Sequence, residues 1–178
     1  MYVMKKFRVL IMAFISMPFL LVQANESKTQ DTDSNSYSIY LVRHAEKQMD
    51  KDDPDLTQCG EFRAKQLASI LENANIKNIY STRYKRTMAT ASPLAAQQKL
   101  AIKNYAPNKL EQFAWQLIKE KQNAVIFGHS NTTPQLAELL SQTKVESISE
   151  KQYRGIYQVV ISGEERHLTL LMQPLICK

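Results

Sequence analysis

The stretch that decides the fold is a short apolar run that ends in an arginine and a histidine, Tyr37-Ser38-Ile39-Tyr40-Leu41-Val42-Arg43-His44-Ala45-Glu46. A second apolar run leads to another histidine, Ala124-Val125-Ile126-Phe127-Gly128-His129-Ser130. Short apolar runs of this kind are typical of strands buried in an α/β sheet. Because the carboxyl ends of parallel strands meet at one edge of the sheet, we expect His44 and His129 to share a site. The pattern favours an enzyme.

Strand and helix patterns alternate through the rest of the chain. The predicted strands are 38–42, 78–81, 102–105 and 124–127, and the predicted helices are 58–72, 83–98, 109–121 and 135–141. Thr57 is placed to cap the first helix, and we assign the apolar face of that helix to Phe62, Leu67, Ile70 and Leu71. Two last strands, 157–161 and 168–172, are expected to form an antiparallel hairpin. This order predicts a three-layer α/β/α sandwich with a mostly parallel central sheet.

The N-terminal segment has the pattern of a secretory signal. Lys5, Lys6 and Arg8 precede an uncharged run of 14 residues, 9–22, and a small residue follows at Ala24. An uncleaved membrane anchor is the alternative, but the run falls short of the roughly 20 apolar residues needed to span a bilayer. We therefore predict a signal peptide at 1–24, a flexible polar lead-in at 25–36 and one domain at 37–178, in a periplasmic or secreted protein.

The charge balance changes when that signal is removed. The whole chain has 23 basic and 17 acidic residues, and loss of the signal leaves 20 basic residues, a net charge of +3. The basic residues are spread along the chain and do not form a stripe. We therefore expect no nucleic-acid partner, and no stable membrane insertion after cleavage.

The chain has two cysteines, Cys59 and Cys177. An oxidising exported compartment allows a disulfide between them, which would tie the C-terminus to the first helix. Two separate buried thiols fit the sequence equally well. Neither cysteine has a second one at metal-ligand spacing, so the sequence does not indicate zinc.

Four segments together resemble the signatures of the histidine phosphatase superfamily, in its phosphoglycerate mutase-like branch (branch 1). In chain order they are Leu41-Val42-Arg43-His44-Ala45-Glu46, Asp55-Leu56-Thr57-Gln58-Cys59-Gly60-Glu61-Phe62-Arg63-Ala64, Tyr80-Ser81-Thr82-Arg83-Tyr84-Lys85-Arg86-Thr87-Met88-Ala89-Thr90-Ala91 and Phe127-Gly128-His129-Ser130-Asn131. Four motifs in the right order are more specific than any one of them. The resemblance implies a phosphoglycerate mutase-like fold and a phosphatase that needs no metal or other cofactor.

The resemblance also implies roles for individual residues. His44 corresponds to the histidine that becomes phosphorylated, and Arg43 and Arg86 correspond to arginines that bind the phosphoryl oxygens. Arg83 and Lys85 compete with Arg86, and only the register of the motif selects Arg86. His129 corresponds to the histidine that donates a hydrogen bond to the phosphoryl group, and the neighbouring Asn131 is a further candidate for substrate binding.

Two departures from the family pattern stand out. Ala45 occupies the position where the family usually has glycine. Many relatives also carry a glutamate that protonates the leaving group, in an insertion that this chain lacks. The proton donor is therefore unassigned, with Glu46 and Glu111 as candidates. His167 lies in a polar turn and receives no role.

The function that follows is an exported phosphomonoesterase acting through a phosphohistidine intermediate. Its substrate is expected to be a phosphorylated small molecule or glycan, with a cell-envelope sugar phosphate as one candidate. A phosphoglycerate mutase is disfavoured, because its glycolytic substrates are cytoplasmic. A non-catalytic phosphate-ester binding protein and a protein phosphohistidine phosphatase are the alternatives.

Overall fold

A computed structural model describes residues 36–49 and 52–175 of the 178-residue chain. The predicted signal and nearly all of the lead-in lie outside the described residues. The described strands are β1 (Tyr37–Arg43), β2 (Asn78–Ser81), β3 (Ile102–Asn104), β4 (Ala124–Gly128), β5 (Gly155–Ser162) and β6 (Glu165–Met172). The described helices are α1 (Gln58–Ile70), α2 (Lys85–Gln98), α3 (Leu110–Glu120) and α4 (Thr132–Ser141).

The six described strands form one sheet in the order β3-β2-β4-β1-β5-β6. The pairs β2–β3, β2–β4 and β1–β4 are parallel. The last two strands add an antiparallel edge, since β5 pairs with β1 and with β6. The mostly parallel sheet and the closing hairpin are thus confirmed.

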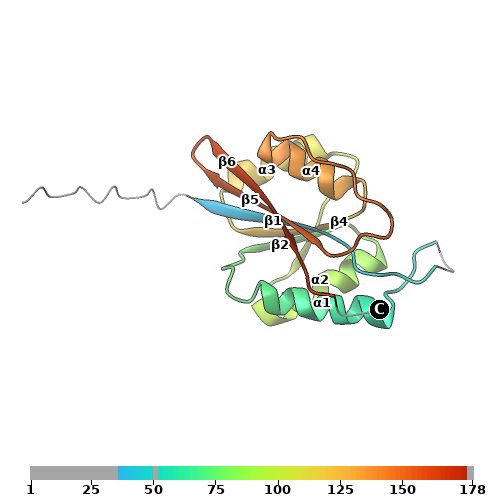
Figure 1. The fold of residues 1–178 in the computed structure, drawn as a ribbon. Coiled ribbons are helices and arrows are strands. Elements are labelled where there is room, and N and C mark those ends of the chain that lie inside the picture. The colour runs from blue at the N-terminus through green and yellow to red at the C-terminus, as the bar shows by residue number, and fades with distance from the viewer. Residues whose placement is uncertain (1–35, 50–51, 176–178) are drawn as a thin grey trace, which may run out of the picture. The chain divides into compact units, whose positions relative to one another are not determined.

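Helices cover both faces of this sheet. Figure 1 shows α1 and α2 on one face, and α3 and α4 on the other. The side chains of β4 alternate accordingly: Ala124 and Ile126 pack into the core beneath α3 and α4, while Val125 and Phe127 pack into the core beneath α1 and α2. A strand buried on both faces reads as a continuous apolar run, as this one does. The predicted three-layer sandwich is confirmed.

The predicted apolar face of α1 was half wrong. Leu67 and Leu71 are buried as expected, but Phe62 and Ile70 are 54% and 44% exposed. The buried face of α1 is formed by smaller residues and one cation, Gly60, Arg63, Ala64, Leu67 and Ala68. Small side chains are buried at the start of this helix because α1 packs closely against the loop that follows β1.

Two contacts define the start of α1. Thr57 caps the helix as predicted, because its Oγ1 accepts a hydrogen bond from the Gly60 backbone N–H at 3.1 Å. Gly60 itself lies against the loop after β1: a Cβ at this position would overlap the carbonyl oxygen of Glu46. A residue with a side chain cannot fit there unless the backbone moves.

The start of α4 also differs from the prediction. The helix begins at Thr132, three residues before the predicted Gln135. Pro134 fits within the first turn of this helix, because its missing N–H would have no intrahelical partner there. No helix in residues 36–49 and 52–175 is long and apolar enough to cross a membrane.

Candidate active site

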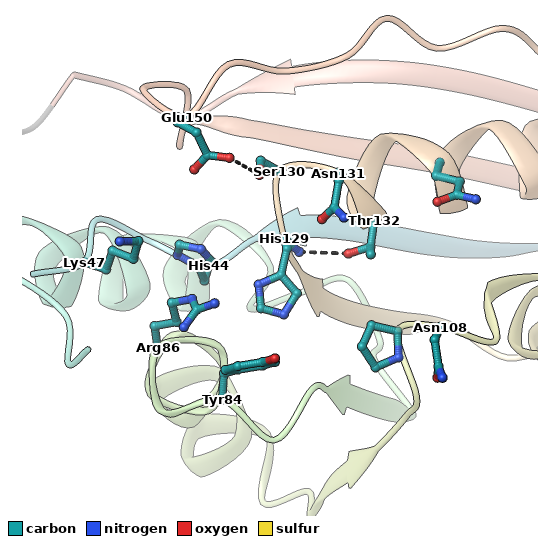
Figure 2. Close-up of a pocket in the computed structure, with 12 residues that line it drawn as sticks. His44, Lys47, Tyr84, Arg86, Asn108, His129, Ser130, Asn131, Thr132 and Glu150 are labelled. Atoms are coloured by element: carbon teal, nitrogen blue, oxygen red, sulfur yellow. Dashed lines mark hydrogen bonds between the residues drawn. The ribbon is translucent and has the colours of Figure 1, made fainter. Parts of the chain in front are cut away.

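The carboxyl ends of β1 and β4 lie side by side and deliver the two predicted histidines to one place. Arg43 is paired with Gly128 in the parallel register, and the His44 backbone N–H donates a hydrogen bond to the Gly128 carbonyl at 3.0 Å. His44 directly follows Arg43, and His129 directly follows Gly128. Their ring centroids lie 5.6 Å apart, edge to face, and Figure 2 shows both rings at the same pocket.

That pocket has a volume of about 550 Å³. It is lined by four predicted site residues, His44, Arg86, His129 and Asn131, and by Lys47, Tyr84, Pro107, Asn108, Ser130, Thr132, Gln135 and Glu150. Three other predicted residues, Arg43, Glu46 and Glu111, do not line it. The pocket lies where residues following β1, β2 and β4 converge.

His44 is held as a neutral imidazole. The residue is only 3% exposed, and burial, with the Arg43 and Arg86 charges nearby, lowers its pKa to about 3. Its Nδ1 lies 2.8 Å from the Ala45 carbonyl oxygen. Because a carbonyl oxygen can only accept, Nδ1 carries the ring proton. The lone pair is therefore on Nε2, which makes this nitrogen the nucleophilic one.

His129 is neutral as well. Burial, followed by the charges of Arg86 and Arg43, lowers its pKa to about 4. Its Nε2 lies 3.0 Å from Thr82 Oγ1, and the Tyr84 ring contacts it edge to face at 5.0 Å. A phosphoryl dianion in the pocket would favour protonation of this ring, because an opposite charge stabilises the charged form.

Arg86 supplies a cation from the first turn of α2. Its guanidinium lies 3.5 Å from Asp53 and stacks over the Tyr84 ring at 4.5 Å. Its Nε is buried and has no hydrogen-bond partner among the described residues. The neighbouring Arg83 and Lys85 are exposed and do not line the pocket. The register that selected Arg86 thus selected the arginine that reaches the pocket.

Arg43 lies beneath the segment between α4 and β5. It is 2% exposed, and its terminal nitrogens donate to the carbonyl oxygens of Ser149 and Gln152 at 3.0 and 3.1 Å and to the carboxylate of Glu150 at 2.5 Å. Its guanidinium also stacks on Tyr153 at 4.2 Å. The charge still acts on both histidines, but a carboxylate occupies the guanidinium donors in this structure.

Comparison with known proteins agrees with this geometry. Residues 39–111 match the family model described as the histidine phosphatase superfamily, branch 1. The match includes the first three motifs and ends before His129, which the parallel pairing of β1 and β4 brings to the same pocket. Among curated proteins, no sequence gave a significant match.

Solved structures of several phosphatases share the fold. A mycobacterial glucosyl-3-phosphoglycerate phosphatase superposes with a TM-score of 0.65 at 11% identity, over 78% of this chain and 100% of that one. The α-ribazole phosphatase of Shigella flexneri gives 0.64 at 14% identity, over 76% and 96%. A phosphoserine phosphatase of Entamoeba histolytica gives 0.56 at 16% identity, over 78% and 98%. At these identities the likeness concerns the fold.

Neither candidate proton donor, Glu46 or Glu111, lines the histidine pocket. Glu46 is bound by Arg63, whose Nε donates to the two carboxylate oxygens at 2.9 and 2.8 Å. Its backbone carbonyl accepts from the Thr57 N–H at 2.9 Å, so Glu46 fixes the loop after His44. Glu111 is exposed at the start of α3 and lines a neighbouring cavity of about 570 Å³.

Sequence reasoning missed several residues of the pocket. Lys47 and Tyr84 each lie within or beside a motif, so the motif spacing could have marked them as candidates. Glu150 had no such signal. Residues 142–154 lack the periodicity of a helix or a strand, and the hydrogen bonds of Glu150 to Arg43 and Ser130 form only in the folded chain.

Two further expectations from the sequence concern metal ions and the two cysteines. No group of three or more His, Cys, Asp or Glu side chains suited to a metal ion occurs among residues 36–49 and 52–175. Cys59 lies in the first turn of α1, whereas Cys177 falls outside the described residues. The pairing of Cys59 with Cys177 stays a prediction.

Proposed function

We propose that this chain is a phosphatase that hydrolyses phosphate monoesters through a phosphohistidine on His44. The main support is the tautomer of the His44 ring. Its Nδ1 donates to the Ala45 carbonyl oxygen, so Nε2 has a free lone pair. The pocket that His44 lines is also lined by Arg86 and His129. A neutral imidazole is a competent nucleophile toward phosphorus, and the covalent intermediate divides one difficult hydrolysis into two easier steps.

The first step forms the bond from His44 Nε2 to phosphorus and breaks the bond to the ester oxygen, which leaves with a proton as an alcohol. In the second step a water molecule gives up a proton as its oxygen bonds to phosphorus, the bond from phosphorus to Nε2 breaks with its electron pair returning to the imidazole, and phosphate leaves. Arg86 and a protonated His129 stabilise the charge on the equatorial oxygens. Arg43 contributes its charge from behind the pocket.

The proposal includes independence from divalent metal ions. Two guanidinium groups and His129 can supply the positive charge that a metal ion supplies in other phosphatases. This view is supported by the charges of Arg43 and Arg86, which depress the pKa of both histidines and so act directly on the pocket.

The substrate we propose is an exported sugar phosphate of the cell envelope. The signal-like N-terminal segment supports export, and three side-chain amides in the pocket lining, Asn108, Asn131 and Gln135, suit the hydroxyl groups of a sugar. One of the structurally similar proteins is described as a phosphatase of a glucosyl phosphoglycerate. A protein phosphohistidine would lack such hydroxyl groups.

The test is a panel of phosphate monoesters, aryl and sugar esters included, given to chelator-treated mature protein. We expect phosphate release with an aryl ester and faster release with a subset of sugar phosphates. His44→Ala should lose turnover, whereas the control His167→Ala, at an exposed histidine outside the pocket, should keep it. Saturable binding without any release would instead identify a phosphate-ester binding protein, and activity restored only by a divalent ion would refute metal independence.

A further inference from the structure

Glu150 is a carboxylate for which neither the family pattern nor the proposed mechanism has a role. It lies in the segment that joins α4 to β5, and its side chain is 73% exposed. Among the described residues it is the one carboxyl group that lines the pocket shared by His44 and His129. Figure 2 shows Glu150 on the side of the pocket opposite Arg86 and Tyr84.

Two hydrogen bonds hold this carboxylate in place. One oxygen accepts from Arg43 Nη2 at 2.5 Å, and the other accepts from the hydroxyl of Ser130, which directly follows His129. The backbone around Glu150 is fixed too, because Arg43 also donates to the carbonyl oxygens of Ser149 and Gln152. The carboxylate is therefore positioned by groups next to both histidines and is still open to a ligand.

A phosphoryl group entering the pocket changes the surroundings of this carboxylate. In the structure the Ser130 hydrogen bond, with the charge of Arg43, lowers the pKa of Glu150. A phosphoryl dianion bound in the pocket would place negative charge near the carboxylate, and this change favours the protonated form. Substrate binding would thus favour a carboxylic acid at the site of reaction.

The other carboxyl groups near the two histidines, Glu46, Asp53 and Glu111, do not line the pocket. Glu46 is bound by Arg63, and Asp53 accepts from the Lys85 N–H while it pairs with Arg86. Glu111 lines the neighbouring cavity and not the histidine pocket.

We propose that Glu150 is the general acid and base of the reaction, an inference that rests on the proposed phosphatase function. As Nε2 of His44 bonds to phosphorus and the ester bond breaks, the Glu150 carboxyl group gives its proton to the departing oxygen and an alcohol leaves. The Glu150 carboxylate then takes a proton from the water that attacks the phosphohistidine. Phosphate leaves, the imidazole of His44 returns to its neutral form, and Glu150 releases the proton that it took from water and returns to the carboxylate seen in the structure.

The dependence of rate on the leaving group tests this role. A departing alkoxide needs a proton far more than a departing nitrophenolate does. Loss of a general acid therefore slows the hydrolysis of alkyl esters more than that of nitrophenyl esters. For Glu150→Gln, turnover of glycerol phosphate should fall roughly 100-fold more than turnover of 4-nitrophenyl phosphate, the lower end of what general acid catalysis contributes. Glu150→Asp should recover part of the loss with glycerol phosphate.

Glu146→Gln is the matched control, because Glu146 is exposed on the same segment and does not line the pocket. It should change turnover of neither ester. Equal losses with both esters in Glu150→Gln would show that Glu150 does not protonate the leaving group, and no loss with either ester would show that Glu150 has no part in the reaction. Both outcomes overturn the proposed role, while wild-type protein inactive on 4-nitrophenyl phosphate would overturn the phosphatase function itself.

Discussion

The Ala45 carbonyl oxygen accepts a hydrogen bond from Nδ1 of His44 at 2.8 Å, and so the residue next to His44 sets the tautomer of its ring. Ala45 is itself fixed, since its N–H donates to Thr90 Oγ1 at 2.9 Å. The ring therefore presents Nε2 to the pocket before any substrate arrives. This preorganisation is what a nucleophile requires, because the proton is already on the correct nitrogen.

The tautomer and the protonation state of His44 can be measured directly. Because burial lowers the pKa of this residue to about 3, we expect its ring to stay neutral, with the proton on Nδ1, from pH 8 down to about pH 4. Nitrogen-15 NMR of the imidazoles, assigned with His44→Gln, reports both properties. A ring that titrates near the ordinary histidine pKa of about 6.5 would contradict the burial described for this residue.

The free energy of unfolding at acidic pH should depend on both buried histidines, His44 and His129. Their pKa values are about 3 and about 4 in the folded protein, against about 6.5 in the unfolded chain. Between these values the unfolded chain binds more protons, so the free energy of unfolding falls as the pH drops below about 6.5. The slope is limited to about 1.4 kcal/mol per pH unit for each extra proton.

The comparison uses wild type and the double variant His44→Gln, His129→Gln in denaturant titrations at pH 7 and pH 5, in buffers without phosphate. The carboxylates contribute to both proteins, so the difference isolates the histidines. The double variant should lose less stability on acidification. An identical loss in the two proteins would mean that neither histidine is held neutral by the fold.

Gly60 should be a sensitive position for both stability and activity. A Cβ there overlaps the Glu46 carbonyl oxygen, so Gly60→Ala must move either α1 or the loop that carries His44. Overpacking of this kind costs roughly 1–3 kcal/mol, and we expect a lower melting temperature together with reduced turnover. Glu61→Ala, at an exposed neighbouring site, is the control, and a melting temperature equal to that of the control would contradict the close packing.

Arg86 should matter through the shape of its guanidinium as well as its charge. Paired donors suit the equatorial oxygens of a phosphoryl group better than an ammonium does. Loss of one preorganised donor typically costs about 100-fold to 1,000-fold in rate, so Arg86→Ala should lose that much turnover of an aryl phosphate and Arg86→Lys should recover only part. Arg83→Ala, at an exposed arginine outside the pocket, should behave as wild type; a loss equal to that of Arg86→Ala would mean that the register was misread.

Much of the fold was predictable because it follows from local patterns. Continuous apolar runs marked the strands buried on both faces, and the parallel rule then brought His44 and His129 together. The face of α1 was not predictable from apolar spacing, since an ion pair between Arg63 and Glu46 and the close approach of Gly60 decide which side is buried. These contacts exist only once the loop after β1 is in place.

The residues of the site that follow strands could also be predicted from the sequence. His44 and His129 each follow a strand, and Arg86 follows β2 within a recognisable motif. The hydrogen bond between Arg43 and Glu150 could not be predicted. The two residues are far apart in the sequence, and Glu150 lies in a segment without periodicity. A pairing that depends on tertiary structure leaves no signal in either stretch alone.

The central claim is that His44 carries the phosphoryl group, and trapping the covalent intermediate tests it most directly. Mature protein turning over a labelled aryl phosphate at low temperature is denatured without acid and digested with trypsin. Cleavage after Arg43 and Lys47 isolates the peptide His44-Ala45-Glu46-Lys47. We predict label on Nε2 of His44, stable to base and labile to acid. Efficient turnover with formation shown to outpace breakdown, yet with no label on this peptide, would contradict the account.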